Sequence, residues 1–135
     1  MRKKDCKIKT VLGLNDYVLQ RGSFLMDDCI FCKIIRGEIP SKKVYEDEHT
    51  LAFLDINPAS KYHTLVIPKN HCVNIYDVSV DELAKVMGTV KTVVEMYEEQ
   101  YGMKHVNIVN NNGALAGQEV FHLHIHIIPK WEGQK

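Results

Sequence analysis

The chain has 135 residues, of which 45% are hydrophobic and 25% charged, ordinary values for one soluble globular domain. No stretch approaches the roughly 18 apolar residues of a membrane span, and four cysteines are too few for a disulfide scaffold at this length. The 17 basic and 17 acidic residues cancel, but residues 1–25 carry +4 (six basic, two acidic) and residues 26–135 carry −4 (11 basic, 15 acidic). A mildly acidic body argues against general nucleic-acid binding.

Residues 1–25 differ in composition from the rest of the chain. Their apolar residues are interrupted by Gly13, Asn15 and Asp16, so the continuous run of about 7–15 apolar residues that a secretory signal needs is missing. A mitochondrial presequence stays open as a weaker alternative, because the basic residues are mainly lysines. We predict a flexible or peripherally docked basic extension over residues 1–25 and one domain over residues 26–135. The expected location is the cytoplasm, with the nucleus as the alternative.

The segment after Asp28 is typical of one short helix and three strands. Asp28 is a suitable N-cap for a helix over Cys29–Arg36. The strands that follow are Val44-Tyr45, Thr50–Asp55 and Thr64–Ile67. The alternation of the second strand sets Leu51, Phe53 and Asp55 on one face.

The clearest predicted element is a helix over Val80–Tyr101. Ser79 and Glu82 form a capping box at its start, and Gly102 stands where a left-handed C-terminal stop belongs. Its apolar stripe consists of Leu83, Val86, Val90, Val94, Tyr97 and Tyr101. The strands that follow are Val106–Val109 and Phe121–Ile128. Strands on both sides of one long helix predict an α+β fold: an antiparallel sheet of about five strands, one long helix and a short N-terminal helix.

Three of the seven histidines lie within five residues, at His122, His124 and His126. The period of a strand points these imidazoles to one face and Leu123 and Ile125 to the other. Burial and mutual repulsion would keep most of the imidazoles neutral near pH 7. The pattern indicates either a metal site or a nucleophile with supporting acid and base groups.

A loop of small and amide residues, 110–118, precedes the histidine segment. Its glycines let backbone N–H groups approach an anion, and its Asn and Gln side chains add neutral donors. Such a loop beside neutral imidazoles favours a phosphate over a bare metal ion, although Asn-Gly turns are common.

The segment Gly117–Ile128, with its alternating histidines, resembles the signature of the histidine triad (HIT) family. The upstream segments that share the resemblance are Cys29–Ile35, Gly37–Pro40, Leu54–Pro58 and His63–Lys69. The resemblance covers residues 27 to about 131 and is closest to the nucleotide-binding, HINT-like branch of bacterial type. It implies a HIT-like fold with the elements predicted above.

The resemblance implies a nucleotidyl hydrolase or transferase that cleaves purine nucleoside phosphoramidates, or related α-phosphate esters and anhydrides, through a covalent nucleotidyl-histidine intermediate. His124 would be the nucleophile, because an imidazole attacks phosphorus without prior deprotonation. His126 would contact phosphate oxygens, and His63 would support the nucleophile from nearby. The other implied phosphate-binding residues are Asn111, Gly117, Gln118 and Glu119.

The two ends of the substrate raise different questions. Glu119 stands where well-studied eukaryotic members often have Ser or Thr, and a carboxylate there repels phosphate unless it is protonated. The leaving group and the choice between adenine and guanine therefore stay open. At the nucleoside end, the resemblance implies that Asp55 accepts hydrogen bonds from the ribose hydroxyls. The implied apolar slot for the base consists of Phe31, Ile34, Phe53, Leu54 and Ile56.

Cys29 and Cys32 form a single CxxC pair, which by itself is compatible with redox activity, metal binding or chance. His71 and His122 match the positions that complete a tetrahedral shell in zinc-bearing relatives. The resemblance therefore implies a structural zinc ion at these four residues, with His122 fixing the segment that presents His124. No organic cofactor is implied.

We predict a purine nucleotide substrate, an AMP-type product and a homodimer formed through the long helix and an adjoining strand, with no membrane partner. One alternative is a nucleotide-binding regulatory or interaction protein with vestigial turnover. A second alternative is a metal-dependent site built on all three histidines of the triad.

Overall fold

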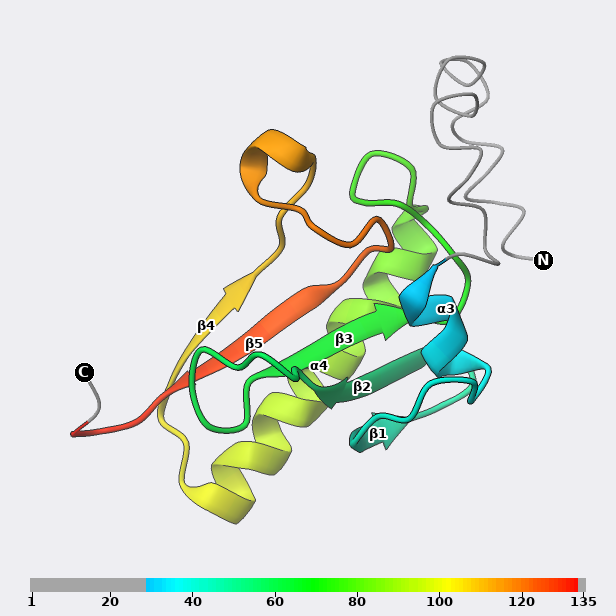
Figure 1. The fold of residues 1–135 in the computed structure, drawn as a ribbon. Coiled ribbons are helices and arrows are strands. Elements are labelled where there is room, and N and C mark those ends of the chain that lie inside the picture. The colour runs from blue at the N-terminus through cyan, green and yellow to red at the C-terminus, as the bar shows by residue number, and fades with distance from the viewer. Residues whose placement is uncertain (1–28, 134–135) are drawn as a thin grey trace, which may run out of the picture.

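A computed structural model of the chain describes residues 29–133. The predicted extension over residues 1–25 and the predicted cap at Asp28 lie outside this range. Within it, one antiparallel sheet of five strands packs with a long and a short α-helix, so the predicted fold class is confirmed (Figure 1). None of the helices described is both long enough and apolar enough to cross a membrane.

The elements follow one another in a simple order along the chain. They are α3 (Ile30–Ile35), β1 (Lys43–Glu46), β2 (Thr50–Leu54), β3 (Thr64–Pro68), α4 (Val80–Tyr101), β4 (His105–Val109), the 3-10 helix η3 (Ala114–Ala116) and β5 (Ile125–Lys130). In the sheet the order is β1-β2-β3-β5-β4, and every neighbouring pair is antiparallel. The last strand therefore lies inside the sheet, between β3 and β4.

The alternation of side chains divides the sheet into two faces. The face covered by α4 forms a core around Ala52, Val66 and Ile125, and Figure 1 shows α4 running behind the sheet. Two hydroxyl pairs fasten the helix to this face: Thr50 to Thr89 and Thr64 to Tyr97, each at 2.6 Å between oxygens. The opposite face packs against α3 in a core formed by Cys29, Phe31, Cys32, Ile34, Leu51, Phe53, Leu65 and Ile67. We call it the α3 face.

Both predicted ends of α4 are confirmed, but its capping differs in one contact. Ser79 Oγ accepts a hydrogen bond from Glu82 N at 3.1 Å, and Gly102 ends the helix in the left-handed region with φ of 70°. The Glu82 carboxylate accepts from Asn70 Nδ2 at 3.0 Å and so ties the helix to the segment after β3. Only half of the predicted capping box is therefore present.

Two predicted boundaries near the histidines are wrong. The short helix begins at Ile30 because Cys29 is its N-cap, with Sγ accepting from Cys32 N at 3.3 Å. The last strand begins at Ile125, whereas we had placed its start at Phe121. Just before Ile125 the backbone forms a hydrogen bond to a segment outside the sheet: Leu123 N donates to Cys72 O at 2.7 Å.

Candidate functional site

The histidine segment reaches the α3 face, as its alternation predicts. His126 lies opposite Leu65 in the β3–β5 register, and Leu65 belongs to the core on that face. The rings of His122 and His124 both lie against the Phe31 ring, at centroid distances of 5.8 and 5.2 Å. The three imidazoles therefore share one side of the sheet, but His122 and His126 belong to two different clusters of polar side chains.

The first cluster joins two cysteines and two histidines. Cys29 Sγ lies 3.3 Å from His122 Nδ1, and Cys32 Sγ lies 3.3 Å from His71 Nδ1 and 3.6 Å from His122 Nδ1. All four candidate ligand atoms lie within 4.8 Å of one another. The structure thus brings together the four residues that the sequence nominated for zinc.

The chemistry of this donor set fits a zinc ion. His122 Nε2 lies 2.9 Å from Pro68 O, so it donates its proton there and turns the lone pair of Nδ1 toward the sulfurs. Metal-bound histidines are commonly held in this way by a carbonyl at the second nitrogen. Hydrogen bonding from the neighbouring Cys32 is the largest cause that holds the pKa of the Cys29 thiol far below its usual value, which favours the thiolate that binds metal.

His124 is oriented by its own chain. Its Nδ1 lies 2.8 Å from His122 O and donates to that carbonyl, so Nε2 carries the lone pair. Asn110 Nδ2 donates to His124 O at 3.1 Å and fixes the backbone at the same point. The residue is only 7% exposed, and burial lowers the pKa of His124, so the imidazole is neutral at pH 7. A buried, neutral and aligned Nε2 is a suitable nucleophile.

The second cluster surrounds His126. His126 Nδ1 lies 2.9 Å from His63 Nε2, and Asp55 Oδ2 lies 3.5 Å from the same nitrogen of His63. The backbone N–H of Ala59 donates to His63 Nδ1 at 2.9 Å. Burial lowers the pKa of His63, and burial with the neighbouring His124 and His63 lowers that of His126 to about 4. Both rings are therefore neutral at pH 7.

Neither cluster contains all three histidines of the triad. Among residues 29–133, two groups of donors lie close enough for one ion: the Cys/His cluster, and the group formed by Asp55, His63 and His126. His122 belongs to the first group and His126 to the second. The alternative of a single metal site on all three triad histidines therefore finds no support in the described residues.

The two side-chain amides that the sequence nominated in the loop before β5 differ in their hydrogen bonding. Gln118 is buried, and its amide donates to Val73 O at 2.7 Å and Val120 O at 3.0 Å while its oxygen accepts from Asn74 and Gly113. Within the described part of the chain, the half-buried Asn111 amide makes no hydrogen bond and lies beside Gly117. The sequence nominated both amides for phosphate, and only that of Asn111 has its donors uncommitted.

The remaining nominated residues lie on the α3 face, on the α4 side of the sheet or at the surface. Phe31, Ile34 and Phe53 are buried in the core on the α3 face, where the Phe31 ring also contacts His124. Asp55 follows β2 in the alternation that brings Phe53 to this face, whereas Leu54 points to the α4 side. Ile56 is 87% exposed. Glu119 is exposed, yet near enough for its charge to act on His124.

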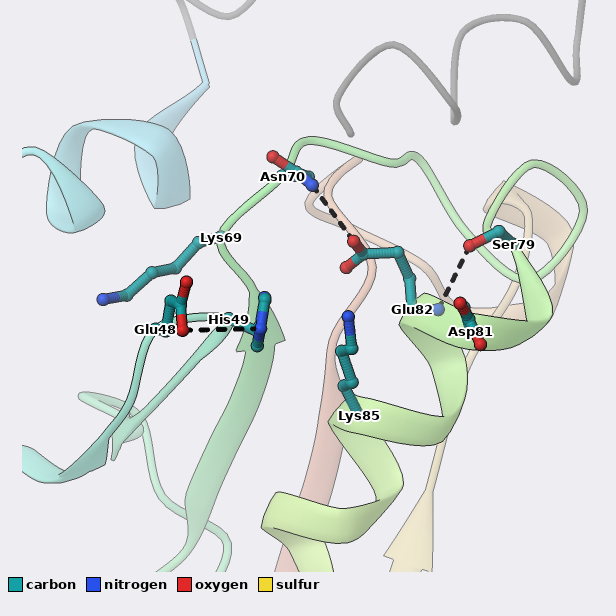
Figure 2. A pocket seen from close by; sticks show the side chains of 8 residues that line it. All are labelled: Glu48, His49, Lys69, Asn70, Ser79, Asp81, Glu82 and Lys85. Atoms are coloured by element: carbon teal, nitrogen blue, oxygen red, sulfur yellow. Dashed lines mark hydrogen bonds and ion pairs between the residues drawn. The ribbon is translucent and has the colours of Figure 1, made fainter. Parts of the chain in front are cut away.

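A separate cavity of about 460 Å³ lies between the start of β2, the end of β3 and the first turns of α4 (Figure 2). Its side chains are Glu48, His49, Lys69, Asn70, Ser79, Asp81, Glu82 and Lys85. Much of this lining is already paired: Lys69 with Glu46 at 2.8 Å and Asn70 with Glu82 at 3.0 Å. None of the histidines of the triad lines it, and we assign it no ligand.

Sequence reasoning missed the groups that orient the imidazoles. These are the carbonyls of Pro68 and His122 and the N–H of Ala59, all of them backbone atoms. A backbone donor or acceptor leaves no residue-type signal.

Comparison with known proteins identifies the family. The HIT domain model matches residues 36–133, which is most of the chain, so the protein belongs to the HIT family. An uncharacterized HIT-like protein of Methanocaldococcus jannaschii is 59% identical over 105 residues, covering 78% of this chain and 81% of that protein. The adenosine 5′-monophosphoramidase hnt1 of Schizosaccharomyces pombe is 46% identical over 102 residues, covering 76% of this chain and 74% of the enzyme.

A solved structure supports the same assignment. The crystal structure of a zinc-bound histidine triad family protein from Mycobacterium smegmatis superimposes with a TM-score of 0.77 at 37% identity. The match covers 82% of this chain and 80% of that one.

The neutral histidines predict a stability that declines in acid. An unfolded histidine binds a proton near pH 6.5, whereas the pKa of His63 is lowered in the fold and that of His126 lies at about 4. Between these values the unfolded state binds more protons than the folded state. The contribution of these histidines to the free energy of unfolding should therefore be fully present above about pH 6.5 and should decrease as the pH falls toward about 4. Urea denaturation over this pH range measures it. His126→Gln should reduce the decline, and an unchanged decline in this variant would contradict the assignment.

Proposed function

We propose that the protein is a nucleotidyl hydrolase or transferase that cleaves purine nucleoside phosphoramidates, or related α-phosphate esters and anhydrides. The observation that carries this proposal is the orientation of His124, whose Nδ1 is committed to the carbonyl of His122 at 2.8 Å. Its Nε2 is left neutral and free to attack phosphorus. The similarity to an adenosine 5′-monophosphoramidase supports the same reaction class.

The reaction would proceed in two displacements at phosphorus. The lone pair of His124 Nε2 forms a bond to the α-phosphorus, and the bond to the leaving group breaks with its electron pair going to that group. An amine leaving group takes up a proton from solvent at this stage, which balances the proton that the attacking water later returns to solvent. Water then attacks phosphorus, the N–P electron pair returns to Nε2, and the water gives its proton to solvent as the nucleotide monophosphate leaves.

Neutral donors would stabilise the negative charge that develops on the phosphate oxygens. His126 accepts at Nδ1, so its proton is on Nε2 and is available to a phosphate oxygen. The uncommitted amide of Asn111 is a second donor, and the positive φ of 95° at Gly117 holds the loop close to it. Donors fixed before the reaction stabilise the transition state without reorganising.

The nucleoside would lie along the α3 face. Asp55 is 18% exposed, and one of its oxygens is held by Asn57 N at 2.9 Å, so the carboxylate has a fixed direction in which to accept from ribose hydroxyls. The aromatic pair Phe31 and Phe53, at a centroid distance of 5.5 Å, supplies the apolar slot for the base. The purine preference follows from the family resemblance alone, which does not fix the leaving group.

His124→Ala is the direct test of the proposed reaction. Incubation with an adenosine phosphoramidate should release AMP from the natural protein, and the variant should lose at least about 10³-fold in kcat/KM while it still binds AMP. Acid quenching during turnover, followed by mass spectrometry, should detect AMP attached to His124. His49→Ala, which changes an exposed histidine outside the site, is the matched control. Tight AMP binding with no turnover of any α-phosphate substrate would favour the binding-protein alternative.

We also propose that Cys29, Cys32, His71 and His122 hold a structural zinc ion. Four nitrogen and sulfur donors within 4.8 Å, three of them buried, are the arrangement of closed structural sites, which have no position for substrate. The ion would supply a cross-link between α3, the segment after β3 and the segment before β5. His122, held by Pro68, would then fix the carbonyl that orients His124.

Elemental analysis tests the zinc proposal. Protein purified without chelator should contain about one zinc ion per chain, and Cys32→Ser should lose the metal and lower the Tm. His49→Ala should keep both the metal and the Tm. A chain without zinc and with an unchanged Tm in Cys32→Ser would refute the site.

We further propose a homodimer formed through α4 and β4. β4 is an edge strand whose only neighbour among the described strands is β5, and its outer edge leaves backbone groups available for pairing. Ile108 on this strand is 42% exposed, and Met87 on α4 is 41% exposed. Pairing of two such edges about a two-fold axis would bury these apolar groups.

Light scattering of the purified protein tests the dimer. The natural chain should have the mass of two copies, and Ile108→Lys should shift it toward one copy, because the charge would be buried at the edge. Leu115→Lys, at an exposed position of η3, should leave the mass unchanged. A monomeric natural chain would refute the dimer, and a dimeric Ile108→Lys would refute this interface.

A further inference from the structure

The group formed by Asp55, His63 and His126 has an arrangement that a ribose contact does not explain. Asp55 Oδ2 is directed at His63 Nε2, 3.5 Å away, although His63 itself is nearly buried with a side-chain exposure of 6%. The same nitrogen lies 2.9 Å from His126 Nδ1. One atom of His63 therefore faces both the carboxylate and the neighbouring histidine.

The backbone of Ala59 decides which nitrogen of His63 carries the proton. Ala59 N–H donates to His63 Nδ1 at 2.9 Å, and a neutral imidazole has one donor and one acceptor nitrogen. Nδ1 is therefore the acceptor, and the proton lies on Nε2. From there it is donated to His126 Nδ1, which in turn places the proton of His126 on its own Nε2.

The same tautomer argues against a metal ion in this group. Its three candidate ligand atoms lie within 4.8 Å of one another, but a protonated Nε2 of His63 has no lone pair for a cation. A metal-bound histidine usually donates its second N–H to an acceptor, whereas the second nitrogen of His63 accepts from Ala59. The contacts of this group therefore fit a proton on His63 Nε2 and not a metal ion.

We infer that Asp55 has a second role beyond the ribose: together with the N–H of Ala59, it holds His63 in the tautomer that donates to His126. This inference rests on the proposed function only in one respect, namely that the N–H of His126 Nε2 donates to a phosphate oxygen of the substrate. The opposite tautomer would set two N–H groups against each other at Ala59. It would also turn a lone pair of His63 toward both the Asp55 carboxylate and the lone pair of His126.

Asp55 is thus a positioning residue for His126 as well as a ligand of the substrate. Asn57 N donates to Asp55 Oδ1 at 2.9 Å, which leaves Oδ2 toward the histidines and the cleft. Asp55→Asn keeps an Oδ1 acceptor for Asn57 and removes the charge, so it is a mild variant for testing the second role.

Nitrogen NMR of histidine-labelled protein reads the tautomer without turnover. In the resting natural chain, His63 should show an unprotonated Nδ1 and a protonated Nε2, and Asp55→Asn should add a population of the other tautomer. Asp81→Asn, which removes an exposed carboxylate on the first turn of α4, should leave the signals unchanged. A protonated Nδ1 in the natural chain would overturn the inference even if the protein proves to be no hydrolase.

A substrate without ribose hydroxyls separates the two roles by kinetics. If Asp55 only binds ribose, Asp55→Asn should cost nothing in kcat/KM on a 2′,3′-dideoxyadenosine phosphoramidate. We expect a loss of about 10-fold to 100-fold to remain, as for other carboxylates that orient a functional histidine. In a His63→Gln background the loss should disappear, because the effect passes through His63. Equal activity of the natural chain and Asp55→Asn on the dideoxy substrate would overturn the inference.

Discussion

His122 is buried between the end of β3 and the two cysteines, and both nitrogens of its ring are engaged. Nε2 donates to the carbonyl of Pro68 at 2.9 Å, and Nδ1 faces the sulfurs of Cys29 and Cys32. Its backbone carbonyl accepts from His124 Nδ1 at 2.8 Å. The position of one peptide group therefore decides which nitrogen of His124 carries the lone pair, and this peptide group belongs to a residue of the Cys/His cluster.

A backbone group orients the imidazole ring of three histidines. The ring of His122 is fixed by a carbonyl, the ring of His124 by a carbonyl, and the ring of His63 by the N–H of Ala59. Backbone groups are held by the fold, so they orient an imidazole without the conformational freedom of a side-chain partner. Burial lowers the pKa of His63, His124 and His126 and keeps these rings neutral, so the tautomer of each ring decides which nitrogen donates and which carries the lone pair.

The sequence predicted those parts of the molecule that depend on residue type. The caps and periodicity of α4 determine both of its ends, and the family resemblance implied the set of Cys29, Cys32, His71 and His122 that long-range folding brings together. The start of β5 was missed because the residue pattern alternates from Phe121 onward, whereas the chain bends at Phe121 and His122 and joins the sheet only at Ile125. His122 and His124 still lie on the predicted side, where both rings contact Phe31. The extension over residues 1–25, the domain boundary and the cytoplasmic location stay predictions.

The proposed phosphate site also bears on the charge of the chain. Its donors are the imidazole of His126 and the amide of Asn111, and both are neutral at pH 7. A fixed cation attracts substrate, transition state and product alike, and such uniform binding does not lower the barrier between bound substrate and transition state. Neutral donors aimed at the phosphate oxygens stabilise the negative charge that develops there in the transition state. An acidic body is therefore compatible with the proposed phosphate site, whose recognition would rest on aligned protons and not on net charge.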